Sequence, residues 1–216
     1  MNRRAFLGTA AALAFMVGPL AAKAGPKIVM FGDSLTEGFG LPPKQGLVPR
    51  LQAWLDQNAT PAQIVNAGLS GDTTYGGRIR IGWSLRSGAD GVIVELGGND
   101  LLLRIGIPEM EKNLDSILTS AGRGGRPVLL VGVNPPARVL RGGGDALAAM
   151  WLRLAKRHDA LLVPDLYAPL WALPEKEARK QVQNDGVYLS RQGVQLVVDQ
   201  VLGPAVAELL ARINAA

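Results

Sequence analysis

The sequence predicts a single α/β domain in which helices cover both faces of a parallel five-stranded sheet. Five short runs of mostly β-branched and apolar residues recur along the chain, and longer segments with apolar residues at helical spacing separate them. No linker-like stretch divides the 216 residues. Strands without a polar alternating face are typical of a parallel sheet that is buried on both sides. The expected architecture is therefore one three-layer α/β/α domain.

The five strand-like runs are apolar and bounded by turn residues, as strands usually are. In chain order they are KIVMF at 27–31, QIVNA at 63–67, GVIVEL at 91–96, PVLLVGV at 127–133 and ALLVPDL at 160–166. Segments with helical periodicity cover residues 47–57, 73–87, 108–121 and 145–157, and a final helix covers about 191–213. The regular alternation of the two patterns predicts five βα units.

Residues 1–24 have the pattern of an export signal, and residues 25–216 form the predicted domain. Arg3 and Arg4 precede an uncharged, weakly apolar stretch, and Ala22-Lys23-Ala24 gives the small-x-small pattern of a signal peptidase site. Paired arginines followed by Ala-Phe-Leu favour a twin-arginine signal over an ordinary secretory one. The stretch is short for a membrane span. We therefore expect a periplasmic or secreted protein without a stable membrane anchor.

The basic charge of the chain belongs largely to this signal. Cleavage after Ala24 would leave 192 residues and remove Arg3, Arg4 and Lys23, so the formal net charge falls from +5 to +2. No basic stripe interleaved with aromatic residues occurs, which argues against a nucleic-acid partner. The sequence contains no cysteine, which excludes disulfides and thiol catalysis, and it shows no metal-ligand cluster or nucleotide-binding motif.

Polar residues follow the strands at the edge where ligands bind in open parallel sheets. Ser34 lies one residue into the turn after the first strand, so its hydroxyl is expected at this edge. The backbone N–H groups of Ser34 and Gly71 and the side-chain amide of Asn99 would converge beside it. Such donors stabilise the oxyanion that forms in acyl transfer. A mere helix cap is the alternative reading of Ser34.

Three ordered blocks, FGDSLTEG, VNAGLSGDTT and VELGGND, resemble the GDSL or SGNH hydrolase family, and in particular its small periplasmic thioesterases, arylesterases and lysophospholipases. The resemblance covers residues 26–213 and implies a flavodoxin-like SGNH hydrolase fold without a cofactor. It implies Ser34 as nucleophile, with Gly71 and Asn99 completing the oxyanion hole, and Asp33 as a structural residue of the turn. The implied substrate is a small-molecule acyl ester or thioester. We expect a monomer.

The family's closing Asp-x-x-His motif is altered in this chain. The segment reads NDGVYLS, so Asp185 is present but Tyr188 stands at the position of the general-base histidine. Imidazole accepts a proton near neutral pH, whereas a phenol with a pKa near 10 is only about 0.1% ionised at pH 7. The substitution predicts impaired or altered ester hydrolysis.

Other groups could replace this base. His158, the only histidine, is expected at the end of a helix, near the sheet edge opposite Ser34. Asp72, Glu37 and Asp100 lie near the site by motif position, although helix capping and exposure to solvent are the simpler expectations for them.

Two segments could form further parts of the site. Arg138 and Arg141, in the loop after the fourth strand, could meet an anionic group. For Trp171 and Leu173, core packing is favoured over ligand contact.

Two functions of different classes remain open. The first is a hydrolase of acyl esters or thioesters in which Ser34, Asp185 and Tyr188 form the catalytic group. The second is a non-catalytic protein that keeps the pocket to bind an acyl, lipid or glycan-ester ligand.

Overall fold

The computed structural model describes residues 25–58, 60–134 and 144–215. The proposed signal and the loop with Arg138 and Arg141 therefore lie outside the described residues. Five parallel strands form one sheet in the order β2-β1-β3-β4-β5. They are β1 (Lys27–Gly32), β2 (Gln63–Gly68), β3 (Gly91–Glu95), β4 (Val128–Val131) and β5 (Leu161–Val163). This confirms the predicted α/β fold with its five-stranded parallel sheet.

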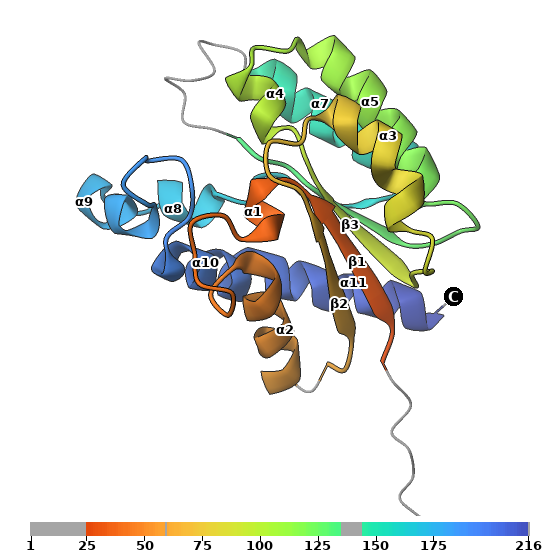
Figure 1. Cartoon of the computed structure of the whole chain (residues 1–216), viewed down its shortest axis with the longest axis horizontal. Coiled ribbons are helices and arrows are strands. Elements are labelled where there is room, and N and C mark those ends of the chain that lie inside the picture. The colour runs from red at the N-terminus through yellow and green to blue at the C-terminus, as the bar shows by residue number, and fades with distance from the viewer. Residues whose placement is uncertain (1–24, 59, 135–143, 216) are drawn as a thin grey trace, which may run out of the picture.

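Helices cover both faces of the sheet (Figure 1). One layer holds α3 (Thr74–Ser84), α5 (Ile107–Ala121) and α7 (Gly144–Arg157), and the other holds α2 (Leu47–Gln57), α10 (Arg191–Val197) and α11 (Gly203–Ala215). Alternate residues of a strand serve the two layers. In β1, Ile28 and Met30 pack with α2, α10 and α11, while Val29 and Phe31 pack with α3, α5 and α7. The sheet is therefore buried on both faces, as its continuous apolar strands predict.

Short helices at the carboxyl end of the sheet complete the fold. They are α1 (Ser34–Glu37), α4 (Gly98–Leu102), α8 (Ala168–Trp171), α9 (Glu175–Ala178) and the 3₁₀ turn Arg179–Gln181. These elements were not predicted, because segments of three to five residues are too short to show a periodic apolar pattern.

The final helix differs from the prediction in one respect. A π-helical segment, Val198–Leu202, separates α10 from α11. Pro204 has no N–H to continue the hydrogen-bond ladder, which explains a change of pattern at this point. Taken as one segment, Arg191–Ala215 is long and apolar enough to span a membrane. Its inner residues, however, belong to the core, among them Val194, Val206 and Leu209.

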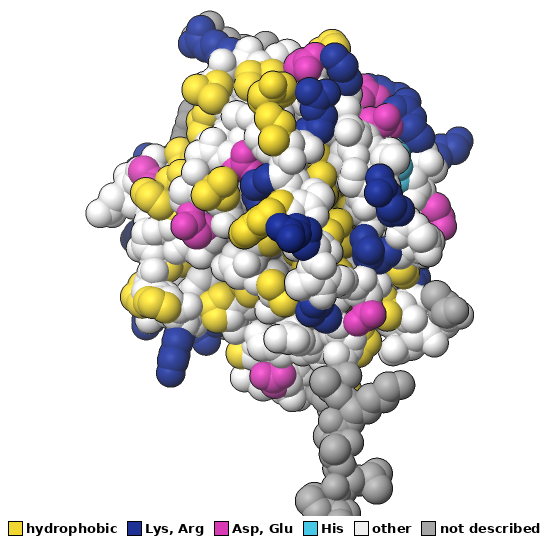
Figure 2. All heavy atoms as spheres, turned by 45° about the vertical axis from the view of Figure 1, so that its right-hand side comes forward, with side chains coloured by type: hydrophobic (Ala, Val, Ile, Leu, Met, Phe, Trp, Pro, Cys, Tyr) yellow, Lys and Arg dark blue, Asp and Glu magenta, His cyan; other side chains and the backbone are white. Residues whose placement is uncertain are grey.

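The surface carries charges of both signs. On the face seen in Figure 2, cationic and anionic side chains of the described residues lie interspersed with apolar ones.

Candidate active site

Ser34 begins the one-turn helix α1, directly after β1. Asp33 caps this helix, since its Oδ1 accepts a hydrogen bond of 3.0 Å from the N–H of Leu35. Gly32 ends the strand where any side chain would collide with Thr36 and with the backbone of Glu95. The strand therefore passes tightly into the turn and holds Ser34 at the carboxyl edge of the sheet, where it is 4% exposed.

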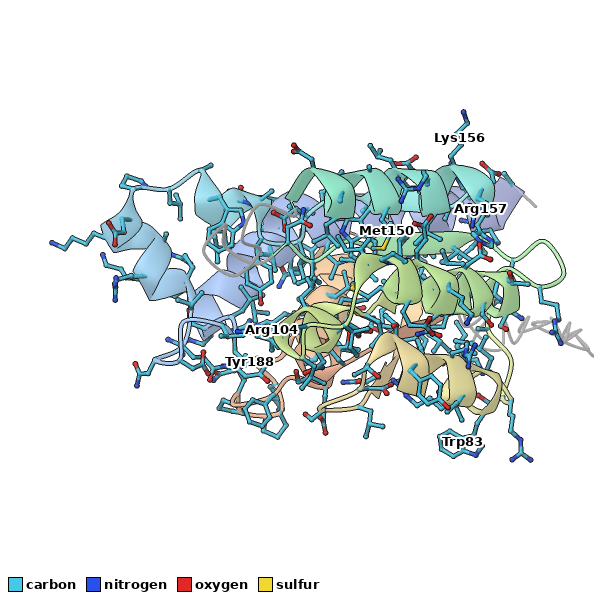
Figure 3. All side chains as sticks on the ribbon, turned by 90° about the horizontal axis from the view of Figure 1, so that it is seen from above. Trp83, Arg104, Met150, Lys156, Arg157 and Tyr188 are labelled. Carbon is cyan, nitrogen blue, oxygen red and sulfur yellow. The ribbon has the colours of Figure 1, made fainter. Side chains whose placement is uncertain are left out.

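Tyr188 makes direct contact with Ser34. The Ser34 Oγ and Tyr188 Oη atoms lie 3.3 Å apart, and the Tyr188 ring packs against that of Phe39 with centroids 4.8 Å apart. In Figure 3, Tyr188 lies well to the left of Arg157. The Tyr188 hydroxyl is thus within hydrogen-bonding distance of Ser34, the candidate nucleophile.

Asp185 shapes the loop that carries Tyr188. Its Oδ1 accepts hydrogen bonds from the backbone N–H groups of Val187 at 2.8 Å and Tyr188 at 3.0 Å. The side chain is exposed. Within the described residues, its carboxylate makes no hydrogen bond to the Tyr188 hydroxyl, so the two do not form a relay like that of an Asp–His pair.

The structure places Asn99 and Gly71 differently with respect to the cavity beside Ser34. The Asn99 Nδ2 donates to the carbonyl of Asp72 at 2.8 Å and to Asp33 Oδ2 at 3.3 Å. The first of these bonds ties Asn99 to the loop that contains Gly71. Gly71 has φ of 79°, a conformation that favours glycine. It is not among the residues that line the cavity beside Ser34, whereas Asn99 is.

The cavity has a volume of about 290 Å³. Its polar end holds the expected site residues Ser34, Asn99, Asp185 and Tyr188, together with Asp33. Its remaining wall is mostly apolar or aromatic and consists of Leu35, Leu101, Leu102, Val133, Tyr167, Trp171 and Val187. A mainly apolar pocket with a few convergent polar groups is the usual form of a small-molecule site.

Trp171 belongs to this wall, which corrects the preference for core packing. It is 45% exposed, its ring stacks on Tyr167 with centroids 5.9 Å apart, and its Nε1 donates to Asp165 at 3.1 Å. Leu173 is half-buried and does not line the cavity. Sequence reasoning missed Tyr167, although its place just after the fifth strand was a usable signal.

The other carboxylates near Ser34 have partners of their own. Asp72 pairs with Arg80 at 2.6 Å, Asp100 accepts from the N–H of Thr74 at 2.8 Å and from its hydroxyl, and Glu37 accepts from the N–H of Ser70 at 2.8 Å. Asp72 is therefore not the cap of α3, because the side chain of Thr73 holds that position. Asp100 does bind the first turn of α3, and Glu37 is exposed as expected.

Two buried carboxyl groups lie beneath the nucleophile turn. Burial raises the pKa of Asp33 to about 6, repulsion by Asp72 and Asp100 adds to this rise, and hydrogen bonds from Leu35 and Ser34 oppose it. Burial and the charge of Asp33 raise the pKa of Glu95 well above its usual value. Glu95 is 0% exposed; its Oε2 accepts from Thr36 at 2.8 Å, and its Oε1 has no partner among the described residues.

His158 lies away from this site. Its Nε2 is 2.8 Å from Asp115 Oδ1 on α5, and its neighbour Arg157 is well separated from Tyr188 in Figure 3. The described residues contain no group of three or more side chains that could hold a metal ion.

Comparisons with known proteins agree with the fold and with the order of the motifs. The model of the GDSL-like Lipase/Acylhydrolase family matches residues 30–196. Esterase TesA of Pseudomonas aeruginosa is 33% identical over 138 residues, which cover 63% of this chain and 69% of that protein. Thioesterase 1/protease 1/lysophospholipase L1 of Escherichia coli K12 is 28% identical over 179 residues, 82% of each chain.

A solved structure of the same family shows the likeness in three dimensions. The crystal structure of AlinE4, an SGNH-hydrolase family esterase, has a TM-score of 0.68 and 34% identity, and the match covers 85% of this chain and 96% of that one. The resemblance that the three sequence blocks indicated is thus confirmed. The chain is an SGNH-type hydrolase and belongs to the GDSL-like lipase/acylhydrolase family.

Proposed function

We propose that this enzyme hydrolyses carboxylic esters or thioesters of small acyl groups, with Ser34 as nucleophile. The observation that carries the proposal is the cavity, in which Ser34 and Asn99 meet an apolar wall of a size suited to an acyl group. The names of the relatives, which include esterase and thioesterase, support the same chemistry.

The expected reaction uses the two sides of the cavity in different ways. The acyl chain lies along Leu101, Tyr167 and Trp171, and its carbonyl carbon lies at Ser34 Oγ. The carbonyl oxygen then receives hydrogen bonds from the N–H groups of Ser34 and Gly71 and from the Asn99 amide. These donors stabilise the charge that develops on this oxygen as the Ser34 Oγ–carbon bond forms.

Tyr188 changes the rate at which this reaction proceeds. A hydroxyl 3.3 Å from Ser34 Oγ orients the nucleophile but removes its proton far less readily than imidazole does. We therefore expect the wild-type enzyme to be slow, and Tyr188→His to raise kcat by about 10²- to 10⁴-fold, the usual contribution of a general base. In that variant, Asp185 would orient the imidazole.

The test is hydrolysis of p-nitrophenyl acetate, butyrate and octanoate by residues 25–216, from pH 6 to 10. We expect slow turnover that Ser34→Ala abolishes. Ser87→Ala, which changes an exposed serine at the other edge of the sheet, should have no effect. Saturable binding of the acyl product without Ser34-dependent turnover in either the wild type or Tyr188→His would instead identify a binding protein.

We further propose that residues 1–24 direct export and that the mature enzyme works in the periplasm or outside the cell as a monomer. The paired arginines and the Ala-Lys-Ala pattern support this proposal. N-terminal sequencing of the protein from a periplasmic fraction should begin at Gly25. A protein that keeps residues 1–24 there would contradict the cleavage site.

A further inference from the structure

The site needs a group that accepts the proton of Ser34, because a neutral hydroxyl attacks an acyl carbon poorly. The hydrogen bonds and the ion pair given above already engage Asp72, Asp100 and Glu37. Asp185 binds two backbone N–H groups, and His158 directly follows α7 and lies against Asp115 of α5. These groups are therefore poorly placed to act as the base.

Asp33 is placed differently from all of them. It lines the cavity, directly precedes Ser34 in the turn and is 2% exposed. Only its Oδ1 is taken up by the helix cap, while Oδ2 faces Asn99 Nδ2 at the longer distance of 3.3 Å. No arginine or lysine among the described residues pairs with it. Oδ2, which accepts only the longer bond from Asn99, keeps a lone pair that can take a proton at the reacting end of the cavity.

The hydroxyl of Ser34 lies between two oxygen-bearing groups. Tyr188 Oη is 3.3 Å from Ser34 Oγ, and Asp33, the preceding residue, lines the same cavity. A hydroxyl is both a donor and an acceptor, and its hydrogen rotates. When the phenol of Tyr188 donates to Ser34 Oγ, the Ser34 hydrogen is directed toward Asp33. Tyr188 therefore positions the nucleophile for this carboxylate.

We propose that Asp33 is the catalytic base of this site and takes the proton of Ser34 as Oγ attacks the acyl carbon. This inference rests on the proposed hydrolase function. It adds a chemical role for Asp33 to the structural one that the resemblance implies.

The proposed step balances in protons and electron pairs. The Ser34 proton passes to Asp33 Oδ2 as Oγ bonds to the acyl carbon, and the carbonyl π pair moves to the oxyanion. The oxyanion then collapses and expels a thiolate or aryloxide, which needs no proton to leave. Asp33 then releases the Ser34 proton to the solvent and is again a carboxylate. Water attacks the acyl-serine, its proton passes to Asp33, and Ser34 Oγ leaves and recovers that proton from Asp33.

The charges around Asp33 suit this role. It is faced by Glu95 on β3, Asp72 after β2, Asp100 on α4 and Tyr167 after β5, and Arg80 donates to the neighbouring carbonyl of Gly32. Glu95 is fully buried, and this burial raises its pKa and disfavours its charged form. With a pKa of about 6, Asp33 is ionised at neutral pH and is a stronger base than an ordinary carboxylate.

The experiment is a double-mutant cycle of Asp33→Asn and Tyr188→His, measured as kcat and KM on p-nitrophenyl octanoate. In the wild-type background, we expect Asp33→Asn to lower kcat by at least about 100-fold, because it removes the base. In the Tyr188→His background, where imidazole takes the proton, the loss should be less than about 10-fold. A purely structural role of Asp33, including its contact with Asn99, would cost the same in both backgrounds.

Two further readouts separate a base from a structural residue. In the wild type, kcat/KM should fall as the pH decreases through about 6, because protonation of Asp33 removes the base. The gain from Tyr188→His should also be larger on ethyl octanoate than on p-nitrophenyl octanoate, because an alkoxide needs a proton donor to leave.

Each outcome decides the proposal. Equal losses in both backgrounds, or an unchanged kcat in Asp33→Asn, would overturn it. Ser34-dependent turnover in Tyr188→His but not in the wild type would leave the hydrolase function standing and overturn the role of Asp33. The absence of Ser34-dependent turnover in both proteins would overturn the proposed function itself and, with it, the role of Asp33.

Discussion

At the scale of single residues, the hydroxyl groups of Ser34 and Tyr188 are in contact in the cavity, and both are weak proton acceptors. Asn99 also lines this cavity and is fixed by its bond to the carbonyl of Asp72. In the proposed reaction, Tyr188 changes which group takes the proton, whereas the donors to the oxyanion, which form the electrophilic side of the site, stay in place.

Asn99 offers a test of the electrophilic side. Asn99→Ala removes a donor to the oxyanion, so we expect kcat to fall by about 10²- to 10³-fold with little change in KM. The measurement is best made on p-nitrophenyl butyrate in the Tyr188→His background, where the starting rate is higher. A rise in KM at constant kcat would contradict the assignment, since it would place Asn99 in substrate binding alone.

The positions of the main site residues could be predicted from motif order, because parallel strands bring their carboxyl ends to one edge. Ser34, Asn99, Asp185 and Tyr188 do line one cavity there. The raised pKa of Asp33 could not be predicted, because it depends on burial in the folded turn and on the approach of Asp72 and Asp100 from other loops. Trp171 was misjudged because its exposure is set by stacking on Tyr167 and by its bond to Asp165.

At the scale of elements, Arg80 of α3 joins three segments that support the site. It pairs with Asp72, donates to the carbonyls of Ala67 and Gly32 at 2.9 and 2.8 Å, and its guanidinium lies 4.0 Å from the centroid of the Phe31 ring. The helix thereby fixes the ends of β1 and β2, the strands that lead to Ser34 and Gly71.

Arg80→Ala should destabilise the fold strongly. It leaves Asp72, whose side chain is only 6% exposed, without its cation. Breaking a buried pair in this way costs about 3–5 kcal/mol of the free energy of unfolding, measured by urea denaturation. Arg86→Ala, at an exposed position just after the same helix, serves as the control and should change it by less than about 0.5 kcal/mol. Similar effects of the two substitutions would contradict this role.

Among the elements, all five strands and the long helices could be predicted, because their burial patterns extend over several residues. The first and last residues of some of these elements differ from the prediction. The fifth strand was expected over 160–166 but spans Leu161–Val163. The chain leaves the sheet at Pro164, because proline has no backbone N–H to donate to a neighbouring strand. The π-helical segment Val198–Leu202 likewise precedes a proline, Pro204, and the spacing of apolar residues does not indicate it.

At the scale of the whole molecule, the two apolar cores leave several carboxyl groups buried at the carboxyl edge of the sheet. Burial raises the pKa of Asp33, Glu95, Asp100 and Asp165 above the ordinary range. The folded protein therefore holds more protons than the unfolded chain at mildly acidic pH. The site is formed at a cost in stability that depends on pH.

This predicts a fold that is more stable at pH 5 than at pH 8. A raised pKa contributes stability that is present below the unfolded-state pKa and is lost as the pH rises through the folded-state pKa. The rise of the Asp33 pKa from 3.8 to about 6 corresponds to about 3 kcal/mol over the full range of titration, of which about 1.4 kcal/mol is lost between pH 5 and pH 8. The lowered pKa values of Glu111 and Asp115 act the other way, but these pairs are exposed and contribute little.

Urea denaturation from pH 4 to 8 measures this dependence. Glu95→Gln should flatten the curve, because it removes one buried titrating group, whereas Glu109→Gln, at an exposed position on α5, should leave the curve unchanged. A free energy of unfolding that stays constant or rises between pH 5 and 8 would show that these carboxyl groups are ionised at no cost in the folded protein.

The central claim is that Ser34 forms an acyl-enzyme in a site that lacks a histidine. The most direct measurement is mass spectrometry of the mature protein, quenched in acid at short times after mixing with p-nitrophenyl octanoate. We expect one octanoyl group, carried on the peptide that contains Ser34, and none on Ser34→Ala. Release of p-nitrophenol at an equal rate by Ser34→Ala, or an octanoyl group on another residue, would contradict the account.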